Sequence, residues 1–119
     1  MTMPDERFRA IRWGGELLQQ MQDDRFVPAR MRDRAKAIAQ HYPSDAALRG
    51  ALERVPTVMP ENWLNAIENA RALFDDLAAS LVGGAETKRK LLYTMRHYPL
   101  RGETGQWSWQ ESWPWLQPD

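Results

Sequence analysis

Apolar residues recur every three or four positions along five stretches of the chain, which is the spacing of amphipathic helices. This spacing predicts helices over about 4–22, 29–41, 45–55, 60–81 and 85–97. Residues that begin or stop helices flank these stretches, namely Thr2 and Ser44 as caps and Pro43, Pro56 and Gly83-Gly84 as stops. We therefore expect an all-α fold of about five helices.

The apolar stripes of these helices also predict the core. It should contain Phe8, Ile11, Leu18, Met21, Met31, Ala35, Ile38, Tyr42, Trp63, Ile67, Ala70, Phe74, Leu77, Leu81, Leu91, Leu92, Met95 and Tyr98. Gly14-Gly15 interrupts the first stripe, and a glycine in mid-helix costs about 1 kcal/mol relative to alanine. A glycine pair there indicates a close approach of another element or a kink.

The chain aligns with itself at an offset of 56 residues, which places 3–43 over 59–99 without a gap. Met3-Pro4 repeats as Met59-Pro60, and His41-Tyr42-Pro43 repeats as His97-Tyr98-Pro99. A duplication accounts for one offset at both ends better than convergence of two amphipathic hairpins does. We expect two tandem helical-hairpin units, 3–43 and 59–99, with pseudo-two-fold symmetry and a linker helix within 44–58.

The whole chain, 1–119, has the length of a single domain. Residues 100–119, called the Trp-rich tail below, break the helical pattern with two glycines and two prolines. This tail contains Trp107, Trp109, Trp113 and Trp115. Each tryptophan pair skips one residue, so an irregular or extended tail would turn both rings of a pair the same way. The tail is either a lid over the core or a partner site.

Composition and charge remove several classes of function. The 16 basic and 16 acidic residues give a formal net charge of +0, so no overall charge favours nucleic acid or membranes. The chain has no cysteine, which excludes disulfides, thiolate nucleophiles and cysteine-based zinc sites. It has neither an apolar signal-peptide core nor a run of about 18 apolar residues. We expect a cytoplasmic protein without membrane contact.

Catalytic and metal-binding patterns are missing from the sequence. His41 and His97 match no zinc-ligand spacing, and we expect both to lie in last helical turns in a structural role. The serines lie in no nucleophile-elbow context, and the chain has no phosphate-binding glycine loop. The carboxylate pairs Asp23-Asp24 and Asp75-Asp76 are interpreted as solvated surface charge. We predict no enzymatic activity, no cofactor and no metal.

Cations are concentrated in the second helix of each unit. They are Arg30, Arg32, Arg34 and Lys36 in the first unit and Lys88, Arg89, Lys90 and Arg96 in the second. The predicted partner contacts among them are Arg30, Arg32, Arg34, Lys88, Arg89 and Lys90. Such residues are most often a solvated helix face. If the symmetry placed the two groups side by side, they would form a positive surface for phosphates or for an acidic protein.

The opening Thr2-Met3-Pro4-Asp5-Glu6-Arg7 and the helix end His41-Tyr42-Pro43 resemble a family of small proteobacterial proteins. Members of that family begin with a TMPDER stretch and end a helix with RHYP. The similarity covers roughly residues 1–45, and Arg96-His97-Tyr98-Pro99 restates the RHYP form. Gln40 departs from it, and the Trp-rich tail has no counterpart. Because this family has no established activity, the resemblance implies a bacterial or bacteriophage origin and a cytosolic location only.

The leading hypothesis from the sequence is a non-enzymatic protein–protein interaction module. The partner is another protein, and the contact is made by the tryptophans of the tail, by the basic helices, or by both. Bacterial immunity and antitoxin-like proteins and phage-encoded inhibitors of host defence (phage–host conflict) belong to this class. The alternative is a nucleic-acid-binding or transcription-regulating domain that uses the basic helices. The chain acts as a monomer or a homodimer under either hypothesis.

Overall fold

The computed structural model of the chain describes residues 2–54, 59–104 and 116–119. These residues form five helices and no strand, which confirms the expected all-α class. The helices are α1 (Pro4–Asp23), α2 (Ala29–Ala39), α3 (Asp45–Leu52), α4 (Glu61–Ser80) and α5 (Ala85–Met95).

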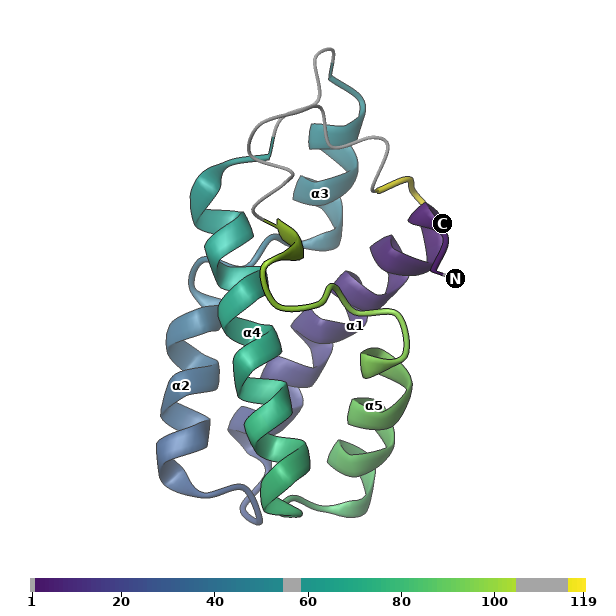
Figure 1. Cartoon of the computed structure of the whole chain (residues 1–119). Coiled ribbons are helices and arrows are strands. Elements are labelled where there is room, and N and C mark those ends of the chain that lie inside the picture. The colour runs from purple at the N-terminus through teal and green to yellow at the C-terminus, as the bar shows by residue number, and fades with distance from the viewer. Residues whose placement is uncertain (1, 55–58, 105–115) are drawn as a thin grey trace.

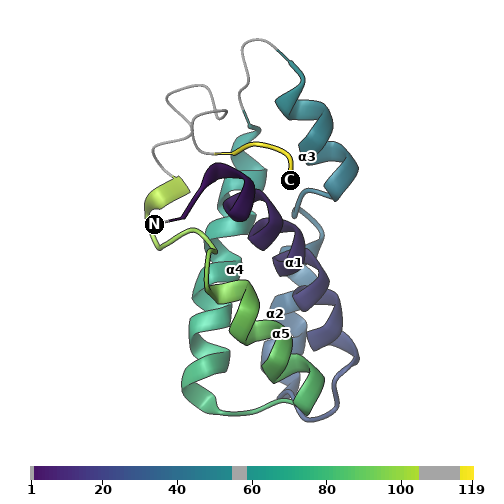
Figure 2. The same ribbon diagram turned by 90° about the vertical axis from the view of Figure 1, so that its right-hand side faces the viewer.

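Four of the helices, α1, α2, α4 and α5, form a bundle, and α3 lies at one end of it (Figure 1). Each of α1 and α4 packs against both α2 and α5, so that α2 and α5 lie on opposite sides of the bundle (Figure 1). The C-terminus lies beside α3, whereas the N-terminus lies next to the segment that follows α5 (Figure 2). The molecule measures 43 × 28 × 24 Å along its principal axes.

The helix ends follow the sequence signals in part. Ser44 caps α3 as expected, because its hydroxyl accepts a hydrogen bond from Ala47 N at 3.1 Å. The prediction that Thr2 caps the first helix was wrong. Met3 occupies the N-cap position of α1, and its backbone N–H donates to Glu6 Oε1 at 2.9 Å. Pro56, expected to stop the linker helix, lies outside the described residues, and α3 ends at Leu52.

Most of the predicted stripe residues are buried in one continuous core. Ile38, Tyr42, Trp63 and Met95 are partly buried and pack against it. Two predictions were wrong, because Leu81 is 80% exposed and Leu92 is 73% exposed. The period of a helix gives the side of the cylinder on which a residue lies, but not whether another element covers that side.

Gly14 allows two tyrosine rings to reach the centre of the bundle. A Cβ atom on Gly14 would lie 2.6 Å from Tyr42 Oη and 2.7 Å from Tyr98 Cε2. Tyr42 donates a hydrogen bond to the Ile11 carbonyl at 2.5 Å, and Tyr98 donates one to the Ile67 carbonyl at 3.0 Å. The expected close approach at this glycine is therefore made by side chains of both hairpins.

The two tyrosine hydroxyls also lie 3.1 Å from each other. Burial raises the pKa of both phenols above their usual range. Both phenols therefore stay neutral. Their contact places Tyr42, which follows α2, next to Tyr98, which follows α5.

Candidate protein-binding surface

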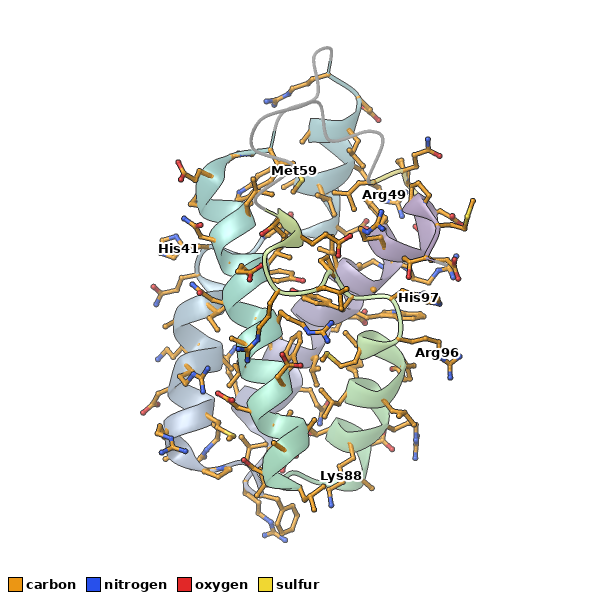
Figure 3. The ribbon with its side chains drawn as sticks, viewed as in Figure 1. His41, Arg49, Met59, Lys88, Arg96 and His97 are labelled. Atoms are coloured by element: carbon orange, nitrogen blue, oxygen red, sulfur yellow. The ribbon has the colours of Figure 1, made fainter. Side chains whose placement is uncertain are left out.

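An apolar groove runs between α4 and α5 and is open to solvent. It has a volume of about 370 Å³, within the range of small ligand pockets. Its lining is Leu77, Ala78, Leu81, Val82, Lys88, Leu91, Leu92 and Met95. Lys88 is the one charged residue of this lining, and it lies at the end of α5 nearest the turn that follows α4 (Figure 3).

The exposure of Leu81 follows from the end of α4. The helix stops at Ser80, and Leu81 takes the left-handed conformation with φ of 55°. The expected stop at Gly83-Gly84 therefore lies beyond the end of the helix, and Gly84 is instead the N-cap of α5. A left-handed residue leaves the helix axis, so the Leu81 side chain does not continue the buried stripe.

The corresponding surface of the first hairpin is polar. At the offset of 56, Leu81 corresponds to Arg25 and Leu92 corresponds to Lys36. A hollow between α1 and α2 is lined by Gln22, Asp23, Ala29, Arg32, Asp33 and Lys36. An exposed apolar groove is therefore a property of the second hairpin rather than of the hairpin fold.

The turn between α4 and α5 is held by Asp24, which the sequence assigned to the solvated surface. That assignment was wrong, because Asp24 is only 8% exposed. Its carboxylate accepts hydrogen bonds from Gly84 N at 2.7 Å, Thr87 Oγ1 at 2.5 Å and Phe26 N at 2.8 Å.

These bonds decide the charge of Asp24. Burial raises its pKa, but the hydrogen bonds from Thr87, Gly84 and Phe26, together with the charge of Arg32, outweigh burial and hold the pKa below 3.8. Asp24 is thus an ionised link between the two inter-helix turns.

The six predicted cations lie on α2 and α5, with α1 and α4 between these helices, so they form two separate surfaces (Figure 1). Three of them form ion pairs: Arg34 with Asp76 at 2.8 Å, Arg89 with Glu86 at 3.0 Å and Lys90 with Glu16 at 3.4 Å. Arg30 is exposed, Arg32 lines the polar hollow, and Lys88 lines the apolar groove. The geometry therefore brings one of the six residues into the groove.

The four predicted tryptophans, Trp107, Trp109, Trp113 and Trp115, lie outside the described residues. The residues on either side of them are anchored. Thr104 is buried and donates a hydrogen bond to Glu68 at 3.1 Å, and Leu116 is fully buried.

Asp119 fixes the last described residues to the bundle. Its carboxylate lies 2.9 Å from Arg12, 2.6 Å from Arg49 and 3.4 Å from Arg9. Burial raises the pKa of Asp119, but the three arginines outweigh burial and hold the pKa below 3.8. No pattern in the sequence indicated this cluster, because its members come from α1, α3 and the Trp-rich tail.

The two histidines lie on opposite sides of the molecule (Figure 3). His97 follows α5 and contacts Thr2 Oγ1 at 3.1 Å and Glu6 Oε2 at 3.0 Å, whereas His41 is exposed after α2. Within the described ranges, no three histidine or carboxylate side chains come close enough to hold a metal ion. In the same ranges, no helix is both long enough and apolar enough to cross a bilayer.

Comparisons of the chain with protein-family models, with curated proteins and with solved structures found no match. The functional argument therefore depends on the surface chemistry described above.

Proposed function

We propose that this protein is a non-enzymatic module that binds another protein through the apolar groove between α4 and α5. The observation that carries this proposal is the exposure of two large leucines on one groove, 80% for Leu81 and 73% for Leu92. Large contiguous apolar patches are uncommon on monomeric proteins and are typical of binding sites.

Leu81 supports the proposal in a second way. Glycine adopts φ of 55° without strain, whereas a branched side chain there costs about 1 kcal/mol. The position thus combines backbone strain with an exposed apolar side chain. Neither property stabilises the isolated fold, so a binding role explains the leucine better than a folding role does.

The groove also indicates the chemistry of the partner. Its lining of apolar side chains from α4, α5 and the turn between them suits an amphipathic helix that places an apolar face into it. Lys88, the charged residue of this lining, would pair with a carboxylate next to that face. Immunity proteins, antitoxin-like proteins and phage-encoded inhibitors bind other proteins, and we keep this class as part of the proposal.

The two hairpins themselves are best explained by duplication with pseudo-two-fold symmetry. Both α2 and α5 have 11 residues, and they begin at 29 and 85, which differ by 56. Tyr42 and Tyr98 occupy counterpart positions and bond to the counterpart carbonyls of Ile11 and Ile67. This agreement of contacts at one offset supports a common origin more strongly than the sequence identities do.

The test of the proposed function is a photo-crosslinking capture in host lysate treated with nuclease. A photoreactive amino acid at position 92 should join one protein, and mass spectrometry of the conjugate should locate the crosslink in an amphipathic segment. The same amino acid at position 100 is the control, because Leu100 is 63% exposed and lies outside the groove lining.

A matched pair of variants completes the test. Leu92→Lys introduces the residue found at the counterpart position 36, and it should abolish capture without lowering the melting temperature. Leu100→Lys should capture normally. If Leu92→Lys leaves capture unchanged, or if the captured partner is a second copy of this chain, the proposal is wrong.

The alternative function is nucleic-acid binding by the basic helices. Exposed Arg30 and Lys88 favour it, whereas the ion pairs of Arg34, Arg89 and Lys90 oppose it. This alternative predicts a gel-shift affinity that falls steeply with salt, and Arg30→Ala or Lys88→Ala should reduce the slope. If the protein binds neither duplex nor single-stranded nucleic acid at low salt, this alternative is wrong.

A further inference from the structure

A second hollow, of about 400 Å³, lies in the first hairpin between α1 and the α2–α3 connection. It is lined by Arg12, Gly15, Glu16, Leu18, Gln19, Ala39, Tyr42, Pro43, Ser44 and Asp45. Gly15 contributes no side chain to fill it, although it lies in the middle of α1.

The counterpart of Gly15 in the second hairpin is Arg71. Its Nη1 atom donates to the carbonyls of Tyr98 at 3.2 Å and Pro99 at 3.4 Å, and its Nε atom lies 3.2 Å from Asp75 Oδ1. The side chain of Arg71 is only 15% exposed. In the second hairpin, therefore, a guanidinium group fills the space beside the end of the second helix.

The first hairpin retains acceptors around the same space. Tyr42 and Pro43 are the counterparts of the two residues whose carbonyls receive Arg71, and both line the hollow. Gln19 replaces Asp75 with an amide oxygen.

The charged groups of the lining already have partners. Glu16 pairs with Lys90 at 3.4 Å, Asp45 with Arg49 at 3.0 Å and Arg12 with Asp119 at 2.9 Å, so an incoming guanidinium would compete for the two carboxylates. Leu18, Ala39 and the ring of Tyr42 supply apolar walls against which an alkyl chain could lie.

We propose that this hollow, the Gly15 pocket, binds the alkylguanidinium group of an arginine. The inference rests on the duplication proposed above, because the correspondence of Gly15 with Arg71 defines the ligand. A guanidinium carries five N–H donors in a planar fork, which matches carbonyl and carboxylate acceptors on several sides. The arginine comes either from a side chain of a partner protein or from a free guanidino compound.

The experiment is a titration of the full chain followed by ¹H–¹⁵N NMR. N-acetyl-L-arginine amide should shift the amides of Gly15, Gln19 and Ser44 saturably, with a Kd on the order of 1 mM. N-acetyl-L-lysine amide carries the same charge and should bind roughly tenfold more weakly, because an ammonium lacks the planar fork. Equal binding of both probes, or no saturable shift, would overturn the proposal.

A third ligand distinguishes the two sources. Free L-arginine adds a charged α-amino group and an α-carboxylate, which a side chain on a partner lacks. Tighter binding of N-acetyl-L-arginine amide than of free L-arginine indicates that the natural ligand is an arginine side chain of a partner protein. The reverse order indicates a free guanidino compound.

Glycine variants test the location of the site. Gly15→Arg places a guanidinium in the pocket from within and should abolish binding. Gly50→Arg is the matched control on α3, where a Cβ atom would have no neighbour within 4 Å. A folded Gly15→Arg chain that still binds arginine would overturn the proposal.

A second pair of variants is needed because a Cβ atom on Gly15 would lie 3.2 Å from Tyr42 Cε1 and could prevent folding. Glu16→Gln should weaken arginine binding severalfold, whereas Glu61→Gln, in the exposed first turn of α4, should leave it unchanged. Equal affinity in both variants would contradict a role for the pocket.

Further variants separate this inference from the proposals on which it rests. Arg71→Gly should open a second arginine site in the second hairpin. If the Arg71→Gly variant binds arginine only at that new site, the proposal that the Gly15 pocket binds arginine is wrong, but the correspondence of the two hairpins is supported. Leu92→Lys should leave arginine binding unchanged. A result that contradicts protein binding by the apolar groove can therefore be told apart from one that contradicts arginine binding by the Gly15 pocket.

Discussion

The two hairpins meet along two seams that are built at counterpart positions but differ in chemistry. In the seam between α1 and α5, the rings of Trp13 and Tyr93 pack edge to face, with their centroids 4.9 Å apart. In the seam between α2 and α4, the counterparts are Asn69 and Ala37, and they line an open hollow of about 290 Å³.

The two histidines also differ between the seams. His97 closes the α1–α5 seam by contacting Glu6 at 3.0 Å, whereas its counterpart His41 and Asn62 line the open hollow of the α2–α4 seam. One backbone arrangement thus supports an aromatic seam and an amide-lined seam in the same molecule. Each seam also has an ion pair, Lys90 with Glu16 in the first and Arg34 with Asp76 in the second. We expect the aromatic contact across the first seam to contribute more to stability than the side chains that line the hollow of the second seam.

The largest effect is expected from truncation of the aromatic seam. Trp13→Ala should lower the free energy of unfolding by about 2–3 kcal/mol, because it removes a partly buried indole and its contact with Tyr93. The matched variant Asn69→Ala, at the exposed counterpart, should change it by less than about 0.5 kcal/mol. Urea denaturation measures both, and equal losses would contradict the contrast.

The next largest effect is expected at the turns, which differ between the hairpins in the same way. Asp24→Ala should cost about 2 kcal/mol, because it leaves the Gly84 N–H and the Thr87 hydroxyl without their acceptor. Ser80, the exposed counterpart of Asp24, should tolerate alanine with little change in urea denaturation. If Asp24→Ala left the free energy of unfolding unchanged, packing rather than these hydrogen bonds would hold the two turns together.

Acid titration sharpens this prediction. Because the folded pKa of Asp24 lies below 3.8, its carboxylate stabilises the fold above that pH, and the stabilisation is lost as the pH falls through the folded value. Asp24→Asn should therefore show a shallower loss of stability than the wild type between about pH 5 and about pH 2. Asp119 titrates in the same direction, so some acid dependence should remain.

An intermediate effect is expected at the glycine beneath the tyrosines. Gly14→Ala should destabilise the protein by about 1–2 kcal/mol, since its methyl group would overlap Tyr42 and Tyr98 despite the better helix propensity of alanine. Gly50→Ala, in open space on α3, should stabilise it by about 0.5–1 kcal/mol. Thermal melts of the two variants should shift in opposite directions.

The smallest effect is expected from building the aromatic seam on the other side. Asn69→Trp combined with Ala37→Tyr reproduces the Trp13–Tyr93 pair at its counterpart positions. The double variant should gain about 1 kcal/mol relative to the sum of the single variants, which is the usual coupling of an aromatic pair. A double-mutant cycle in urea measures this coupling, and zero coupling would show that the seams differ in backbone spacing.

The sequence predicted the helices well because their signals are local. Apolar periodicity placed all five helices, and Ser44 capped α3 as expected. It failed where distant residues decide the outcome. Leu92 continues the stripe of α5, but no element of the described chain covers it, so the periodicity could not distinguish a groove from the core.

The candidate sites were harder to predict for the same reason. Asp24 resembles surface charge until Gly84 and Thr87, 60 and 63 residues away, are placed beside it. The Gly15 pocket is interpreted as an arginine site because Arg71 fills the corresponding space of the second hairpin. The self-alignment already paired Gly15 with Arg71, and that mismatch was the signal that could have located the pocket.

The tyrosine pair has a consequence for how the chain folds. Tyr42 and Tyr98 lie 3.1 Å apart in the centre of the bundle and belong to different hairpins. Either hairpin alone would expose its tyrosine ring and would lose half of a shared interior. The two hairpins should therefore behave as one cooperative folding unit, with a single unfolding transition seen by every probe, even if each half began as an independent copy.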